Sequence, residues 1–148
     1  MARAAEVPFA TTRLVRDACL CLHLQRAARA LARRFDDAFR PLGLTSGQYS
    51  LLMALNRPAP AGIGEVAALL AMDRTTLTAA LKVLQRRNLV AVSVDAQDRR
   101  SRRLALTPAG RALLARAVPV WRRTHAEVER QLPGAGADRL RRDLRTLA

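Results

Sequence analysis

Threonine and basic residues recur at helical spacing along "DRTTLTAALKVLQRRN", residues 73–88. Thr75, Thr78 and Lys82 lie three or four positions apart, so they share one face of a helix. Leucines at positions 77, 81 and 84 fall about 200° away and predict a buried face. Hydroxyl and amino groups on an outward face can hydrogen-bond to base edges in a DNA groove, and a helix N-terminus attracts phosphate. The candidate recognition residues are Arg74, Thr75, Thr76, Thr78 and Lys82. The alternative is that the threonines only cap and pack the helix.

A second basic group lies in "DAQDRRSR", residues 95–102. The flanking segments "LVAVSV", 89–94, and "RLALT", 103–107, are rich in valine and leucine and predict two paired strands. The segment between them is then a polar hairpin loop. A guanidinium at such a tip can enter the narrow minor groove, whose negative potential attracts it. The candidate wing residues are Asp98, Arg99, Arg100 and Arg102. The alternative is a solvated basic loop.

Short helices with recognisable boundaries position these two groups. "LTSGQYSLLMALN" begins with a capping box, in which Thr45 caps the helix and Gln48 reaches back. A short helix is expected within residues 63–72, the turn "LAMD" follows, and Asp73 caps the threonine-rich helix. Asn88 ends that helix because asparagine tolerates the left-handed conformation. Residues 45–107 therefore predict a winged helix-turn-helix lobe.

Longer helices flank this lobe on both sides. Residues 9–42 predict one long helix, whose segment 18–24 is apolar around most of its circumference and needs cover from the chain's own body and from a second copy. Thr107 and Pro108 begin another helix that extends to about residue 131. Residues 137–147 predict a last helix. The expected fold is mainly α, a single unit over 1–148, with a winged helix-turn-helix, a small two- or three-stranded β wing, and dimerisation helices in 9–42 and 108–148.

The charge balance indicates an anionic partner. The 148 residues include 26 Lys and Arg against 12 Asp and Glu, giving a net charge of +14. So basic a chain most often binds nucleic acid. No run approaches the roughly 18 apolar residues of a membrane span, and charges occupy the N-terminal stretch where a signal peptide is apolar. We expect a cytoplasmic protein without a membrane partner.

No enzyme signature is present in the sequence. It contains no phosphate-cradling glycine loop, no paired catalytic carboxylates and no nucleophile with a base in a known motif. We therefore expect no catalytic residue and no cofactor.

The segments "IGEVAALLAMDRTTLTAALKVLQRRNLV" and "DAQDRRSRRLALTPAG" resemble the MarR family of bacterial transcription regulators. The family's wing pattern is D-x-R, a short spacer and then L-x-L-T-x-x-G. This chain resembles it with Asp98, Arg100, Leu104, Leu106, Thr107 and Gly110. The resemblance covers the chain from about Val15 to the C-terminus. Two positions depart from the family pattern: Asn88 replaces a usual glycine, and Val92 replaces a frequent base.

The resemblance implies a homodimer with interlocking terminal helices. Such a dimer binds a palindromic operator in double-stranded DNA, usually as a repressor released by a small, often aromatic, molecule. The resemblance makes Arg100 the minor-groove arginine and gives Asp98 the task of orienting the wing.

The cysteines suggest a second way of responding to a signal. Some similar regulators sense hydroperoxides through one cysteine near the start of the first helix, and Cys21 has a similar placement. Cys19 is two positions away, so on a continuous helix the two thiols point in nearly opposite directions. Cys19 and His23 share a face, but zinc needs more ligands and none is evident, so we expect no metal. Two alternatives stay open: a thiol-based peroxide-sensing repressor using Cys21, and a non-specific architectural nucleic-acid binder.

Overall fold

The computed structural model describes residues 6–147 and shows seven α-helices and a small three-stranded sheet. The elements are α1 (Phe9–Ala18), α2 (Leu20–Phe39), the 3-10 turn η1 (Arg40–Leu42), α3 (Ser46–Ala54), β1 (Ala61–Gly62), α4 (Ile63–Leu69), α5 (Arg74–Arg86), β2 (Val90–Val94), β3 (Arg102–Leu106), α6 (Pro108–Glu129) and α7 (Gly136–Arg145). The strands form an antiparallel sheet in the order β1-β3-β2. The predicted fold class, mainly α with a winged helix-turn-helix, is confirmed. No helix within residues 6–147 is long and apolar enough to cross a membrane.

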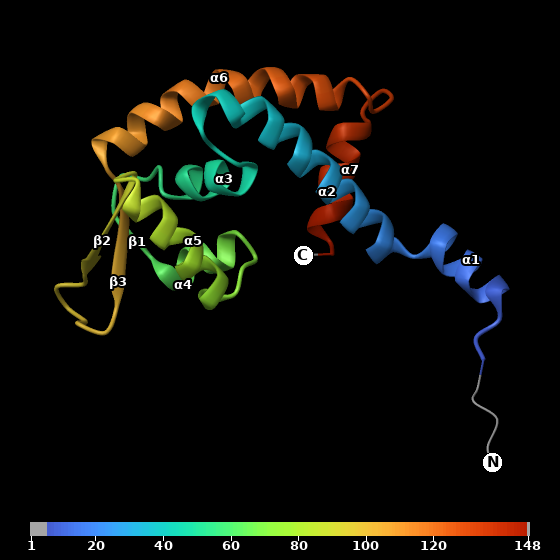
Figure 1. The fold of residues 1–148 in the computed structure, drawn as a ribbon, viewed down its shortest axis with the longest axis horizontal. Coiled ribbons are helices and arrows are strands. Elements are labelled where there is room, and N and C mark those ends of the chain that lie inside the picture. Colours follow the sequence, from blue (N-terminus) through green and yellow to red (C-terminus); the bar gives the residue numbers. More distant parts are fainter. Residues whose placement is uncertain (1–5, 148) are drawn as a thin grey trace, which may run out of the picture.

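The elements form a winged lobe beside a set of long helices. The wing strands, α4 and α5 lie at one end of the molecule, whereas α1 projects from the other end (Figure 1). Helices α2 and α6 pack against each other, and α3 lies between them and the lobe. One buried core joins these parts, with Phe39, Leu52, Val66, Leu77, Leu84 and Leu104 at most 1% exposed. This core fixes α5 relative to the wing.

The predicted helix boundaries of the lobe are confirmed at their caps. Thr45 and Gln48 form the capping box of α3. Asp73 caps α5, and Thr107 caps α6 with Pro108 at its start. Asn88 takes the left-handed conformation, with φ 54°. Each cap uses side chains within three residues of the helix start, so the local sequence is sufficient to predict it.

The prediction of one continuous helix over residues 9–42 was wrong. Cys19 has an extended backbone (φ −74°, ψ 107°) that separates α1 from α2. Its Sγ accepts the Leu22 N–H at 3.4 Å, and the His23 imidazole lies 3.1 Å from the Asp17 carbonyl oxygen. These side chains satisfy backbone groups that the break exposes. Helix α2 then ends at Phe39, and η1 leads to Gly43, which has φ 64°.

Candidate nucleic-acid interface

The leucines of α5 hold the helix on the lobe. Leu77, Leu81 and Leu84 are at most 3% exposed, as their spacing predicts. Asp73 accepts hydrogen bonds from the Thr76 hydroxyl at 2.6 Å and the Thr76 N–H at 2.8 Å. These bonds, the hydroxyl first, lower the pKa of the Asp73 carboxyl. Thr76 therefore stabilises the N-terminal cap of α5, which is the structural alternative to contact with DNA bases.

The opposite face of α5 is open to solvent. Thr75, Thr78 and Lys82 are all exposed and line a shallow hollow with Arg74 and Ala79. The Thr78 hydroxyl donates to the Arg74 carbonyl at 2.7 Å, so its oxygen keeps free acceptor capacity. Within residues 6–147 the Thr75 hydroxyl and the Lys82 amine have no side-chain hydrogen bond. This face can therefore contact a ligand without breaking internal bonds.

Two carboxylates shape the wing turn through its backbone. Asp98 accepts the Ser101 hydroxyl at 2.7 Å and the Arg100 N–H at 3.0 Å, and these bonds lower the pKa of its carboxyl. Asp95 accepts the Gln97 N–H at 2.8 Å and pairs with the Arg103 guanidinium, which together lower the pKa of Asp95. Both carboxylates are therefore held by hydrogen bonds within the wing itself.

The wing arginines have no acidic partner among the described residues. Arg99 and Arg100 form no ion pair, and the Arg102 guanidinium donates to the Arg99 carbonyl at 3.0 Å. All three side chains are exposed. Their charges are consequently available to an external anion.

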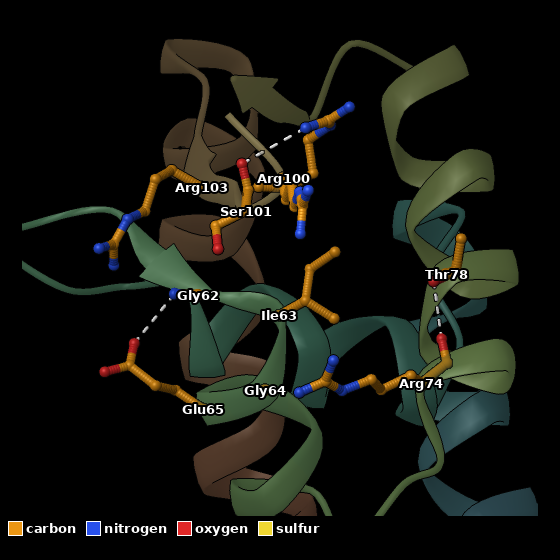
Figure 2. A pocket seen from close by; sticks show the side chains of 10 residues that line it. Gly62, Ile63, Gly64, Glu65, Arg74, Thr78, Arg100, Ser101 and Arg103 are labelled. Carbon is orange, nitrogen blue, oxygen red and sulfur yellow. Dashed lines mark hydrogen bonds between the residues drawn. The ribbon is translucent and has the colours of Figure 1, made fainter. Parts of the chain in front are cut away.

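A hollow between α5 and the wing brings the two candidate groups together (Figure 2). Its lining consists of Gly62, Ile63, Gly64, Glu65, Arg74, Thr78, Arg100, Ser101, Arg102 and Arg103. Of the predicted residues, Arg74, Thr78, Arg100 and Arg102 meet here, while Thr75 and Lys82 continue along α5 and Arg99 lies outside the hollow.

Sequence reasoning missed Gly64 and Arg103 as neighbours of these side chains. They come from α4 and β3, and only the tertiary fold brings those elements beside α5.

The two cysteines lie in the region where α1 meets α2. Cys21 is exposed, and its Sγ accepts the Gln25 side-chain amide at 3.2 Å. Cys19 is half-buried as the cap of α2. In the described part of the chain no three His, Cys, Asp or Glu residues gather as metal ligands would. This region lies away from the wing and α5 (Figure 1).

Comparison with known proteins gives consistent matches. A sequence model of the MarR family matches residues 42–101. The transcriptional activatory protein BadR of Rhodopseudomonas palustris is 36% identical over 95 residues, 62% of this chain and 54% of BadR, so the chain spans about half the length of this relative. The M. tuberculosis transcriptional regulator MosR, solved in complex with DNA, is 42% identical with a TM-score of 0.80, over 87% of this chain and 92% of MosR. BpsR of Bordetella bronchiseptica, whose DNA binding is regulated by 6-hydroxynicotinic acid, is 28% identical with a TM-score of 0.80, over 88% and 93% of the two chains.

Proposed function

Because this chain belongs to the MarR family of transcriptional regulators, we propose that it is a sequence-specific, homodimeric DNA-binding regulator, a repressor relieved by a small molecule. One observation carries the proposal: the exposed face of α5 borders the same hollow as Arg100 and Arg102 of the wing, which have no acidic partner within residues 6–147. In this proposal α5 enters the major groove, and Thr75, Thr78 and Lys82 contact base edges. Arg100 enters the adjacent minor groove from the wing.

An apolar surface on the long helices supports a dimer, and a dimer can bind both halves of a palindromic operator. Helix α2, helix α7 and the segment just after α7 form an apolar concavity lined by Leu24, Ala27, Ala28, Leu31, Leu140, Leu144 and Leu147. Helix α7 buries none of its residues within the single chain. Burying this surface against a partner provides the hydrophobic driving force for dimerisation. The two lobes of the dimer would then reach half-sites about 34 Å apart, one turn of duplex.

A cavity between the long helices and the lobe suits a small aromatic effector. It measures about 150 Å³ and is lined by Phe35, Phe39, Ser46, Tyr49, Ser50 and Trp121 of α2, α3 and α6. The Phe39 and Tyr49 rings stack at 4.7 Å between centroids, and Tyr49 and Trp121 at 6.5 Å. An aromatic ring entering this row changes the packing of α3 against α6. The effector releases DNA if it binds more tightly to a dimer whose lobes are wrongly spaced for the operator than to the DNA-binding form.

Selection of DNA by the purified protein tests the sequence-specific function. The chain is incubated with a random-sequence duplex library, and the retained fragments are sequenced. We expect an inverted repeat with half-sites one helical turn apart. Equal affinity for the enriched duplex and a shuffled duplex would instead support the architectural binder.

An exposed thiol favours a second candidate function, regulation by hydroperoxide. Cys21 is exposed and accessible to an organic hydroperoxide. In this reaction the thiol sulfur is oxidised to sulfenic acid while the hydroperoxide is reduced to an alcohol. Treated and untreated protein are compared for binding to the enriched duplex, with Cys21→Ala and Cys19→Ala as variants. Peroxide-induced release that Cys21→Ala abolishes would support this candidate, and release that survives in Cys21→Ala would exclude it.

A further inference from the structure

The C-terminal end of α5 is tied to two other helices. The Asn88 carbonyl accepts the Thr107 hydroxyl at 2.7 Å, which holds this end beside the start of α6. Arg87, the C-cap residue of α5, reaches α3 instead, and its Nη1 donates to the Gln48 side-chain oxygen at 3.3 Å. Arg87 therefore links the helix that carries the candidate recognition residues to a helix that lines the aromatic cavity.

The Arg87 guanidinium also lies beside the turn through which the long helices lead into α3. Its Nη2 is 3.4 Å from the position that a Cβ would occupy at Gly43, the residue with φ 64° that ends η1. Gln48 Oε1 accepts the Thr45 N–H at 3.1 Å as well, so one amide oxygen completes the capping box of α3 and receives Arg87. Helices α3 and α5 make few direct contacts along their lengths. Arg87 is thus a direct link between this turn and α5.

We propose that Arg87 is a positioning residue that fixes the orientation of α5 relative to the long helices, and that it thereby sets the half-site spacing which the dimer accepts. The inference rests on the proposed function, because spacing matters only where two lobes bind one duplex. Each lobe reaches the duplex from its own long helices, so a lobe that tilts displaces α5 from its half-site. A hydrogen bond from a charged donor restricts this tilt and reduces the ordering that binding requires. Gln48 is the acceptor through which Arg87 acts.

The spacing preference of Arg87→Ala tests the assignment. The probes are the enriched duplex, the same duplex with its half-sites moved a base pair or two closer or further apart, and a single half-site. Arg87→Ala should bind the enriched duplex roughly fivefold more weakly and the altered spacings with unchanged or higher affinity. Affinity for the half-site should match the wild type, because the outward face of α5 is intact. Arg86→Ala is the matched control: it removes a neighbouring exposed arginine without a side-chain hydrogen bond in residues 6–147, and should keep the wild-type spacing preference.

Two changes at Gln48 separate positioning from stability. Gln48→Ala removes the acceptor and weakens the cap of α3, so it should relax the spacing preference and also lower the free energy of unfolding. Gln48→Glu keeps the capping box and offers Arg87 a carboxylate, so its spacing preference should be at least as narrow as that of the wild type. Adding Arg87→Ala to Gln48→Glu should relax the preference again while the cap remains. A role in stability alone would not produce this pattern.

The outcomes separate the inference from the function on which it rests. Arg87 would be a phosphate contact, and the inference overturned, if Arg87→Ala weakens every probe equally, the half-site included, and lowers the salt slope, which is the dependence of log affinity on log salt concentration. A spacing preference that Arg87→Ala leaves unchanged would also overturn it. Both results leave intact the wild-type preference for the enriched duplex over the shuffled duplex, which tests the proposed function. A wild-type chain without that preference would end the proposed function and this inference with it.

Discussion

Some side chains of the wing hold its turn in shape, and others keep a charge that can contact DNA. Asp98 accepts hydrogen bonds from the Arg100 N–H and the Ser101 hydroxyl, and within residues 6–147 it pairs with no guanidinium. The carboxylate therefore shapes the turn without neutralising the adjacent arginine. This arrangement gives a physical reason for the D-x-R pattern: the first residue sets the backbone, and the third carries a free charge.

Arg100→Ala should weaken binding to the enriched duplex and lower the salt slope by about one phosphate's share. The variant removes an exposed charge and keeps the backbone bond to Asp98, so the wing should retain its shape. Fluorescence anisotropy over a salt titration measures both quantities, with Arg116→Ala as the control for a lost arginine elsewhere. An Arg100→Ala protein that matches the wild type at every salt concentration would contradict the wing assignment.

Thr78→Ala should relax sequence preference more than it weakens non-specific binding. The Thr78 hydroxyl oxygen faces outward beside Arg74 and can accept from a base-edge amino group. Competition of the enriched duplex against single-base variants measures the preference, and shuffled duplex measures the non-specific affinity. Thr76→Ala is a useful comparison, because Thr76 bonds to the Asp73 cap and should affect stability more than preference. Equal loss of both affinities in Thr78→Ala would show that another face of α5 reads the bases.

The sequence predicts the contacts between residues a few positions apart, but not the contacts between residues of different helices. The buried leucines and the Asp73 cap follow from spacings of three or four residues. The direction of the Arg74 side chain does not, since its guanidinium lies beside Gly64, which belongs to a different helix. The sequence placed Arg74 on α5, but only the packing of α4 against α5 shows which way its guanidinium turns.

At the scale of elements, the Thr107 and Gly110 pair joins the wing to α6. The Thr107 hydroxyl donates to the Asn88 carbonyl at 2.7 Å and accepts the Gly110 N–H at 3.0 Å. A Cβ at Gly110 would lie 2.1 Å from the Leu89 carbonyl oxygen. The start of α6 thus packs directly on the backbone at the start of β2. This close approach explains the T-x-x-G part of the wing pattern.

Gly110→Ala should destabilise the fold by about 3 kcal/mol, because backbone atoms must move to admit the methyl group. The free energy of unfolding, measured with urea and far-UV circular dichroism, checks this value. Gly47→Ala serves as the control; it sits on an open helix surface, where alanine is favoured over glycine. A Gly110→Ala protein as stable as the wild type would show that α6 can slide away from Leu89 at no cost.

The break at Cys19 shows where element prediction failed. Neither proline nor glycine marks it, and the good helix formers Arg16, Ala18, Leu20 and Leu22 lie on both sides of it. The break depends on Cys19 Sγ and His23 each bonding to a backbone group, a pair of weak local contacts that a hydrophobic pattern does not reveal. The third strand, β1, is only two residues long, and it depends on pairing with β3 rather than on its own sequence.

At the scale of the whole molecule, the single chain leaves too much leucine surface exposed at α2 and α7. Leu140 is 42% exposed, Leu144 38% and Leu147 64%, all beside Leu31 of α2. Contiguous apolar surface of this kind marks an interaction site. A second copy that covers it would also place two lobes on one duplex, so dimerisation and operator affinity should be lost together.

If the proposed dimer forms through this concavity, Leu144→Glu should leave the protein monomeric, because it places a charge in the apolar concavity of each subunit. Analytical ultracentrifugation measures the mass, and anisotropy measures binding to the full enriched duplex and to a single half-site. Without the second lobe, affinity for the full duplex should fall on the order of a hundredfold. Affinity for a single half-site should change little. Leu69→Glu, at an exposed leucine of α4 outside the concavity, should keep the wild-type mass. A Leu144→Glu protein that sediments as a dimer would place the interface on another surface and leave the α2 and α7 concavity unexplained.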